Sequence, residues 1–174
     1  FAELAAQVPA DFRFVIKAPG LVTDALLRDG AGRGTKVNEE FLNPERARLD
    51  FVEPALAGLS AKLGVLLFQI SPLPSSWWKR MPELIERLQA VLNAIRYVRE
   101  KSPDLIVAVE VRDAQWLTPL FTHVLRETGT TYGLGLHAKM PPITEQLPIL
   151  RALWPGPLVC RWNLNPLHGA FGYE

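Results

Sequence analysis

The chain has 174 residues, a net charge of +1 and a hydrophobic fraction of 48%, values typical of one ordinary globular domain. The near-neutral balance and the lack of a basic block argue against a nucleic acid or an anionic membrane surface as a partner. No apolar run approaches the ~20 residues of a membrane span. The single cysteine, Cys160, leaves no internal disulfide, which favours a cytoplasmic protein.

Short apolar runs alternate along the chain with longer amphipathic segments. The apolar runs predict strands at 12–17, 65–69, 106–111, 131–136 and 158–161. Runs that are apolar on both faces are typical of parallel strands. The chain is therefore predicted to be an α/β protein with a parallel sheet and right-handed crossovers.

Four helices are predicted between these strands. The first begins after Asn43, a good N-cap residue that is followed by Pro44. The second starts near Pro82, Thr118 caps the third, and Thr144 caps a short fourth helix.

Residues 19–43 are predicted to form a long, mobile loop. Their glycine run, Gly30 to Gly34, lacks the spacing of a dinucleotide-binding turn and does not directly follow a strand. A dinucleotide-binding fold is therefore disfavoured. Periodicity leaves two architectures open, an open doubly wound sheet and an eight-stranded barrel.

Polar side chains stand at the carboxyl ends of the predicted strands, where α/β sheets and barrels gather their active sites. Glu110 ends an otherwise apolar run and is predicted to be buried and to act as a general acid or base. Lys17, Arg112 and Arg161 are predicted to clamp an anion, and Lys17 is also a candidate nucleophile. The structural alternative is that these charges neutralise one another and hold the rim of the sheet together.

Three further residues are candidates for contact with a ligand. Gln69 offers amide hydrogen bonds, Trp116 an aromatic wall, and Asn163 a polar group beside Arg161. Core packing is the alternative for Gln69 and Trp116, and Cys160 is predicted to be a buried, inert thiol.

No metal site and no cofactor are predicted, because no histidine or carboxylate cluster with ligand spacing occurs. His123 is expected on the surface of a helix, and His137 follows the 131–136 strand.

Four segments resemble a known family. They are FRFVIKAP at 12–19, LLFQISP at 66–72, VAVEVRDAQW at 107–116 and CRWN at 160–163. Their order and spacing are similar to those of the domain-of-unknown-function 72 family, the YecE-like proteins. The resemblance implies a TIM-type β/α barrel whose biochemical activity is not established.

The resemblance also implies that residues 1–174 form one partial barrel domain, truncated at both ends and equivalent to strands three to seven of eight. Such a piece has two unpaired sheet edges and is expected to be unstable or aggregated on its own. The chain departs from the family pattern at Asp24, where a histidine is common. It departs again after Arg161, because the His168–Gly169 pair comes seven residues later; the role of His168 stays open.

The leading functional hypothesis is an enzyme that acts on a small anionic or phosphorylated substrate by acid–base chemistry at the carboxyl ends of the strands. The alternative is a non-catalytic ligand-binding barrel, a sensor or adaptor. Nucleic-acid processing is disfavoured by the charge balance. The sequence leaves the oligomeric state open.

Overall fold

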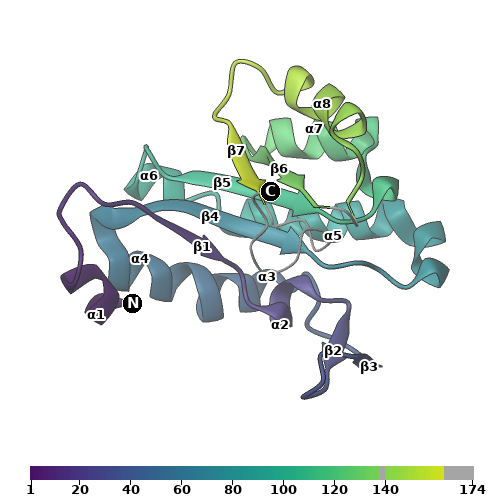
Figure 1. Cartoon of the computed structure of the whole chain (residues 1–174), viewed down its shortest axis with the longest axis horizontal. Helices are drawn as coiled ribbons and strands as arrows, with labels where there is room; N and C mark the ends of the chain where they lie inside the picture. Colours follow the sequence, from purple (N-terminus) through teal and green to yellow (C-terminus); the bar gives the residue numbers. More distant parts are fainter. Residues whose placement is uncertain (138–139, 163–174) are drawn as a thin grey trace, which may run out of the picture.

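Five parallel strands curl into a half-barrel. The computed structural model describes residues 1–137 and 140–162. The strand order is β1-β4-β5-β6-β7 (Figure 1). The strands are β1 (Phe14–Lys17), β4 (Leu63–Ile70), β5 (Ile106–Val111), β6 (Thr131–Leu136) and β7 (Val159–Trp162). Every neighbouring pair is parallel, so the predicted sheet class and all five predicted strands are confirmed.

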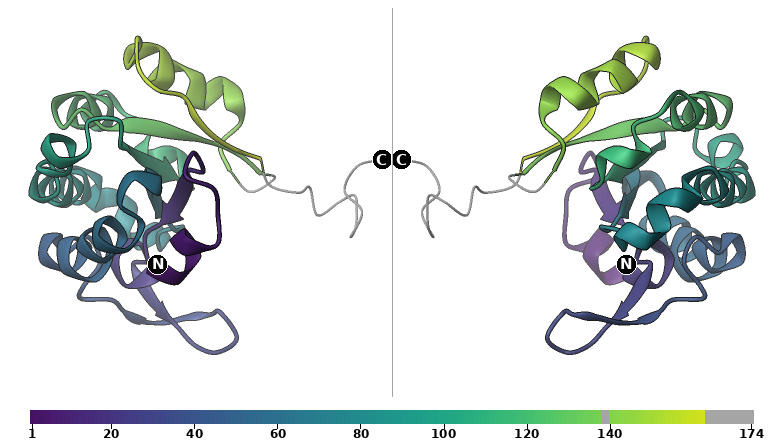
Figure 2. Two further views of the ribbon diagram at one scale, coloured as in Figure 1. Left: turned by 90° about the vertical axis from the view of Figure 1, so that its left-hand side faces the viewer. Right: turned by 90° about the vertical axis from the view of Figure 1, so that its right-hand side faces the viewer.

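Most of the helices cover the outer, convex face of this sheet (Figure 2). They are α3 (Pro44–Arg46), η1 (Ala47–Val52), α4 (Glu53–Leu59), α5 (Met81–Ala94), α6 (Val98–Lys101), α7 (Pro119–Glu127) and α8 (Ile143–Ala152). The short elements at chain turns are α1 (Ala2–Ala6), η2 (Ser60–Lys62), η3 (Ser75–Arg80) and η4 (Ala114–Trp116). Helices confined to one face leave the concave face as the inner surface of the curl.

The predicted helix starts are confirmed in three cases and wrong in one. The Asn43 side chain accepts hydrogen bonds from the N–H groups of Glu45 (2.9 Å) and Arg46 (3.2 Å). Thr118 caps α7 in the same way, and α5 begins beside Pro82. The fourth helix starts at Ile143 rather than after Thr144, because Pro142 holds an extended backbone that ends directly before it.

Residues 19–43 are not a simple loop. They contain α2 (Gly20–Thr23) and an antiparallel hairpin of β2 (Leu26–Arg28) and β3 (Gly34–Val37). The Asp29 carboxylate accepts hydrogen bonds from the N–H groups of Ala31 and Arg33, both at 2.9 Å. Gly32 has a φ of +76°, a conformation that suits glycine, so the glycine run closes a hairpin turn.

Alternation along the strands assigns each side chain to one face. In β4, Leu66, Phe68 and Ile70 are buried against the helices in the main hydrophobic core. Leu67 instead packs with Ala108 in a small cluster on the concave face. Residues two apart on a strand share a face, so Gln69 and Glu110 lie on the concave face as well.

Candidate functional site

Gln69 and Glu110 are neighbours at the carboxyl end of the sheet. The two residues are in register on the adjacent strands β4 and β5. The Gln69 Nε2 group donates a hydrogen bond of 3.1 Å to Oε1 of Glu110. Glu110 is wholly buried, at 0% exposure, as the sequence predicts.

Arg161 reaches the same carboxylate from β7, two strands away. Its Nη1 group donates a hydrogen bond of 3.0 Å to Oε2 of Glu110. Strand β6 lies between them and presents Gly133 and Gly135 to the concave face. A Cβ atom on Gly133 would lie 3.3 Å from Cβ of Glu110, and Gly135 is in register with Arg161. Strand β6 therefore carries no side chain that would separate the two charges.

Arg112 brings a second guanidinium to Glu110. Its Nε atom lies 3.4 Å from Oε1 of Glu110. That buried nitrogen has no hydrogen-bond partner among the described residues. The side chains of Arg112 and Arg161 are 19% and 30% exposed, so neither side chain is fully enclosed by the protein.

We name Gln69, Glu110, Arg112 and Arg161 the rim cluster. Two guanidinium groups face one carboxylate there, which leaves one positive charge in excess. A cluster with this balance attracts anions. The sequence predicted all four residues at this edge, and the structure brings them together.

Lys17, the fifth predicted charge, lies on the same face at the end of β1. It is in register with Leu67 of β4 and is exposed. Its ammonium group makes no hydrogen bond or ion pair with any residue in the described part of the chain. Lys17 therefore flanks the rim cluster without being bound into it.

The remaining predicted ligand contacts do not join the rim cluster. Trp116 is wholly buried and packs edge to face on Phe121, with 6.0 Å between ring centroids. Its role as an aromatic wall stays a prediction, and its position is a core position. Asn163 and His168 lie outside the described residues. His123 is exposed on α7, and His137 is half-buried after β6.

Half-buried polar residues that the sequence analysis missed hold the loops beside the rim cluster. The Asp113 carboxylate accepts a hydrogen bond of 2.7 Å from the Leu73 N–H group and so ties together the loops after β4 and β5. Burial raises the pKa of Asp113, and the Leu73 hydrogen bond opposes that shift. Asp24 binds the Ser71 hydroxyl and, at 2.8 Å, the Arg28 guanidinium. Short polar side chains in loops give no periodic signal in a sequence, which explains why they were missed.

Cys160 is half-buried on β7, beside Arg161. Burial raises the pKa of its thiol, and the negative charge of Glu110 adds to the shift. Because the thiolate is the reactive form, we expect iodoacetamide at pH 8 to alkylate Cys160 more slowly than it alkylates glutathione. Glu110→Gln should speed the reaction, and Glu127→Gln on α7 should not; equal rates in the two variants would contradict this account.

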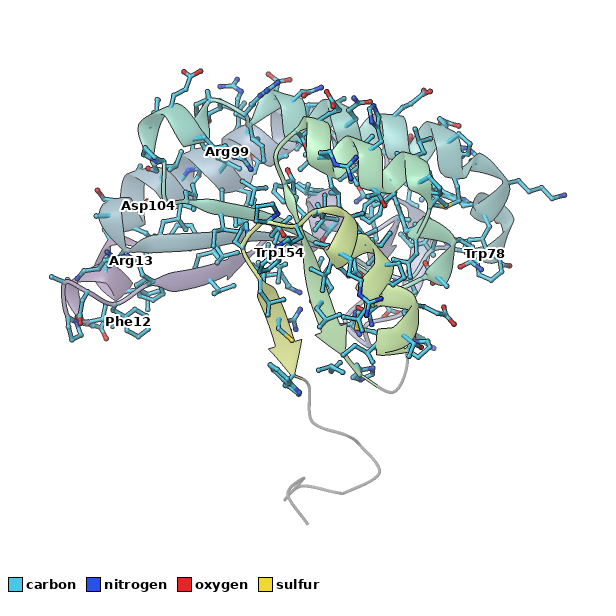
Figure 3. The ribbon with its side chains drawn as sticks, turned by 90° about the horizontal axis from the view of Figure 1, so that it is seen from above. Phe12, Arg13, Trp78, Arg99, Asp104 and Trp154 are labelled. Carbon is cyan, nitrogen blue, oxygen red and sulfur yellow. The ribbon has the colours of Figure 1, made fainter. Side chains whose placement is uncertain are left out.

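Several cavities in the described part of the chain lie away from the rim cluster, including the following two. The larger, about 700 Å³, is at the amino-terminal ends of β4 and β5, with Arg13 and Asp104 in its lining. The other, about 350 Å³ and mostly apolar, lies beside the exposed Trp154. Figure 3 shows Arg13, Arg99 and Asp104 at one end of the sheet and Trp78 at the opposite end. Neither cavity includes a residue of the rim cluster, so both are separate features.

Within residues 1–137 and 140–162, no group of three or more His, Cys, Asp and Glu side chains is placed to hold a metal ion. Over the same ranges, no helix has the length and apolar character needed to cross a bilayer.

The fold and site together define an α/β half-barrel protein with a polar cluster at the carboxyl ends of its strands. The family model of DUF72, described as "Protein of unknown function DUF72", matches residues 1–161. The chain belongs to the DUF72 family, and the resemblance seen in the sequence is confirmed.

Among solved structures, the chain is similar to a DUF72 family protein from Thermotoga maritima MSB8, at 22% sequence identity and a TM-score of 0.48. The match covers 80% of this chain and 45% of that chain, so the matched part is less than half of the Thermotoga protein. The comparison with curated proteins gave no match.

Proposed function

We propose that the rim cluster binds the anionic group of a small molecule, a phosphate or a carboxylate. The observation that carries the proposal is a wholly buried Glu110 that faces two guanidinium groups, on arginine side chains that are 19% and 30% exposed. Planar guanidinium groups bind phosphate and carboxylate oxygens in a bidentate manner. Lys17 adds a further cation on the same face.

In this proposal Glu110 positions the arginines. Both of its oxygens are engaged, Oε1 by Gln69 and Oε2 by Arg161. A fixed carboxylate restricts the guanidinium groups to one geometry, and pre-organised donors bind with a smaller loss of entropy.

Acid–base catalysis by Glu110 is the second candidate. It is favoured by the position of this carboxylate on the concave face at the carboxyl ends of parallel strands, where barrel enzymes place their catalytic groups. A reacting ligand would have to replace one of the present contacts of Glu110. Turnover that survives Glu110→Gln would eliminate Glu110 as the acid or base and leave it the positioning role.

We further propose that these strands are the third to seventh of an eight-stranded TIM-type barrel, within one domain that spans residues 1–174. The support is the curled parallel sheet with helices on its outer face. In the described part of the chain, β1 and β7 are each paired along one edge only. Further strands on these edges would enclose the concave face and the rim cluster with it.

A thermal-shift screen of the full-length protein tests the binding function. The panel contains inorganic phosphate, sugar phosphates, nucleotides, carboxylates and divalent metals. A ligand at about 100 times its Kd stabilises a protein by about 2.7 kcal/mol, which is readily seen as a raised Tm. We expect a hit among the anions.

The matched variants are Arg112→Gln in the rim cluster and Arg99→Gln at the opposite end of the sheet (Figure 3). The anion-dependent rise in Tm should be lost in Arg112→Gln and kept in Arg99→Gln. A panel without an anionic hit, or equal shifts in both variants, would refute anion binding at the rim.

A further inference from the structure

The space beside Glu110 is partly filled by Met140. A Cβ atom on Gly135 would overlap Cε of Met140, would lie 2.5 Å from its Sδ, and would lie 3.4 Å from Cδ of Glu110. The thioether and the carboxylate therefore border the same point on the concave face. Met140 is only 9% exposed, so it occupies this space rather than projecting into solvent.

Gln146 holds the backbone on either side of this contact. Its wholly buried amide donates from Nε2 to the carbonyl oxygens of Gly135 (2.9 Å) and Pro141 (2.6 Å). Its Oε1 accepts from the Gly135 N–H (3.1 Å) and the Tyr132 hydroxyl (3.0 Å). Both donors and both acceptor positions of the amide are used, which is the satisfied state expected of a buried polar group.

This amide links the end of β6 to the residue that directly follows Met140. Since Gly135 is bound through both its N–H and its carbonyl group, and Pro141 through its carbonyl group, the relative position of the two segments is fixed. The absence of a side chain at Gly135 then provides the room into which the thioether fits. Gly135 thus leaves the space, Met140 fills it, and Gln146 fixes the backbone on both sides of it.

We propose that Met140 is a specificity-determining residue of the rim cluster. It limits the room beside Glu110, so that a compact anion such as inorganic phosphate is admitted and a bulky phosphomonoester is excluded. Gln146 is the positioning residue that keeps Met140 there. This inference rests on the proposed anion binding.

The selectivity test measures the Kd values of inorganic phosphate and phenyl phosphate for the full-length protein and its variants. Met140→Ala should bind phenyl phosphate at least tenfold more tightly than the wild type, with inorganic phosphate changed less than threefold. Met140→Leu conserves volume and should behave as the wild type. Met81→Ala, at a buried methionine of α5, is the control for general loosening.

An unchanged phenyl phosphate affinity in Met140→Ala, or an equal gain in Met81→Ala, would overturn the selectivity role. A second measurement needs no ligand. It records the NMR methyl resonances of ¹³C-labelled methionine, and the signal that is lost in Met140→Leu is assigned to Met140. Glu110→Gln should shift the Met140 signal and leave the Met81 signal in place.

These two measurements separate the possible failures. Suppose that the wild type binds no phosphate but the Met140 methyl signal shifts in Glu110→Gln. That result would overturn the proposed function and the selectivity that rests on it, and it would support the position of Met140 beside Glu110. A methyl signal that ignores Glu110→Gln would overturn the Met140 inference alone.

Discussion

Arg161→Ala is expected to lower the free energy of unfolding by about 3 kcal/mol. Removal of one partner from a buried ion pair typically costs 3–5 kcal/mol, because the other charge stays in the protein interior without its partner. The lower end of that range applies, since Gln69 and Arg112 still face the wholly buried Glu110. Urea unfolding of the full-length protein measures the change.

A double-mutant cycle with Glu110→Gln isolates this interaction. In the Glu110→Gln background, Arg161→Ala should cost much less, because no buried charge is left without its partner. If the two substitutions add, the ion pair contributes nothing to stability, and the structural part of this account is wrong.

Trp116→Ala is expected to cost about 3–5 kcal/mol, the range for removal of a large aromatic side chain from a core. Trp116 is wholly buried and packs edge to face on Phe121. Trp116→Phe should cost much less. The buried Nε1 atom has no hydrogen-bond partner among the described residues, so the phenyl ring loses no hydrogen bond.

Trp116→Phe also decides between packing and ligand contact. A core residue should leave the affinity for an anion unchanged in this variant. If affinity falls while the unfolding midpoint stays the same, Trp116 forms the aromatic wall that the sequence suggested.

The sheet and the residues of the rim cluster were predictable from the sequence because the apolar runs show both where the strands lie and where they end. Apolar runs mark the strands, and their period of two assigns alternate residues to opposite faces. Gln69 and Glu110 each stand near the end of an apolar run, which placed both at the carboxyl edge of the sheet. The register of β4 and β5, and the contact of Arg161 with Glu110 across β6, depend on the tertiary structure and could not be predicted from a local sequence pattern.

The errors of the sequence analysis have a common physical origin. The hairpin in residues 19–43 depends on the Asp29 carboxylate, which binds two backbone N–H groups of its own turn. Gln146 is one polar residue in an amphipathic helix, and only the three-dimensional structure shows its four hydrogen bonds. Gly135 gives no signal in the sequence beyond its place in a predicted strand, whereas in the structure its missing side chain makes room for Met140.

The most direct test of the account follows the arginine Nε–H resonances of the full-length protein during a titration with inorganic phosphate. The buried Nε of Arg112 makes its N–H a favourable probe. The account predicts saturable shifts of the Arg112 and Arg161 signals with one common Kd, and no shift for Arg99 at the far end of the sheet. Unchanged rim signals at saturating phosphate, or shifts confined to arginines outside the rim cluster, would contradict an anion site at the carboxyl ends of these strands.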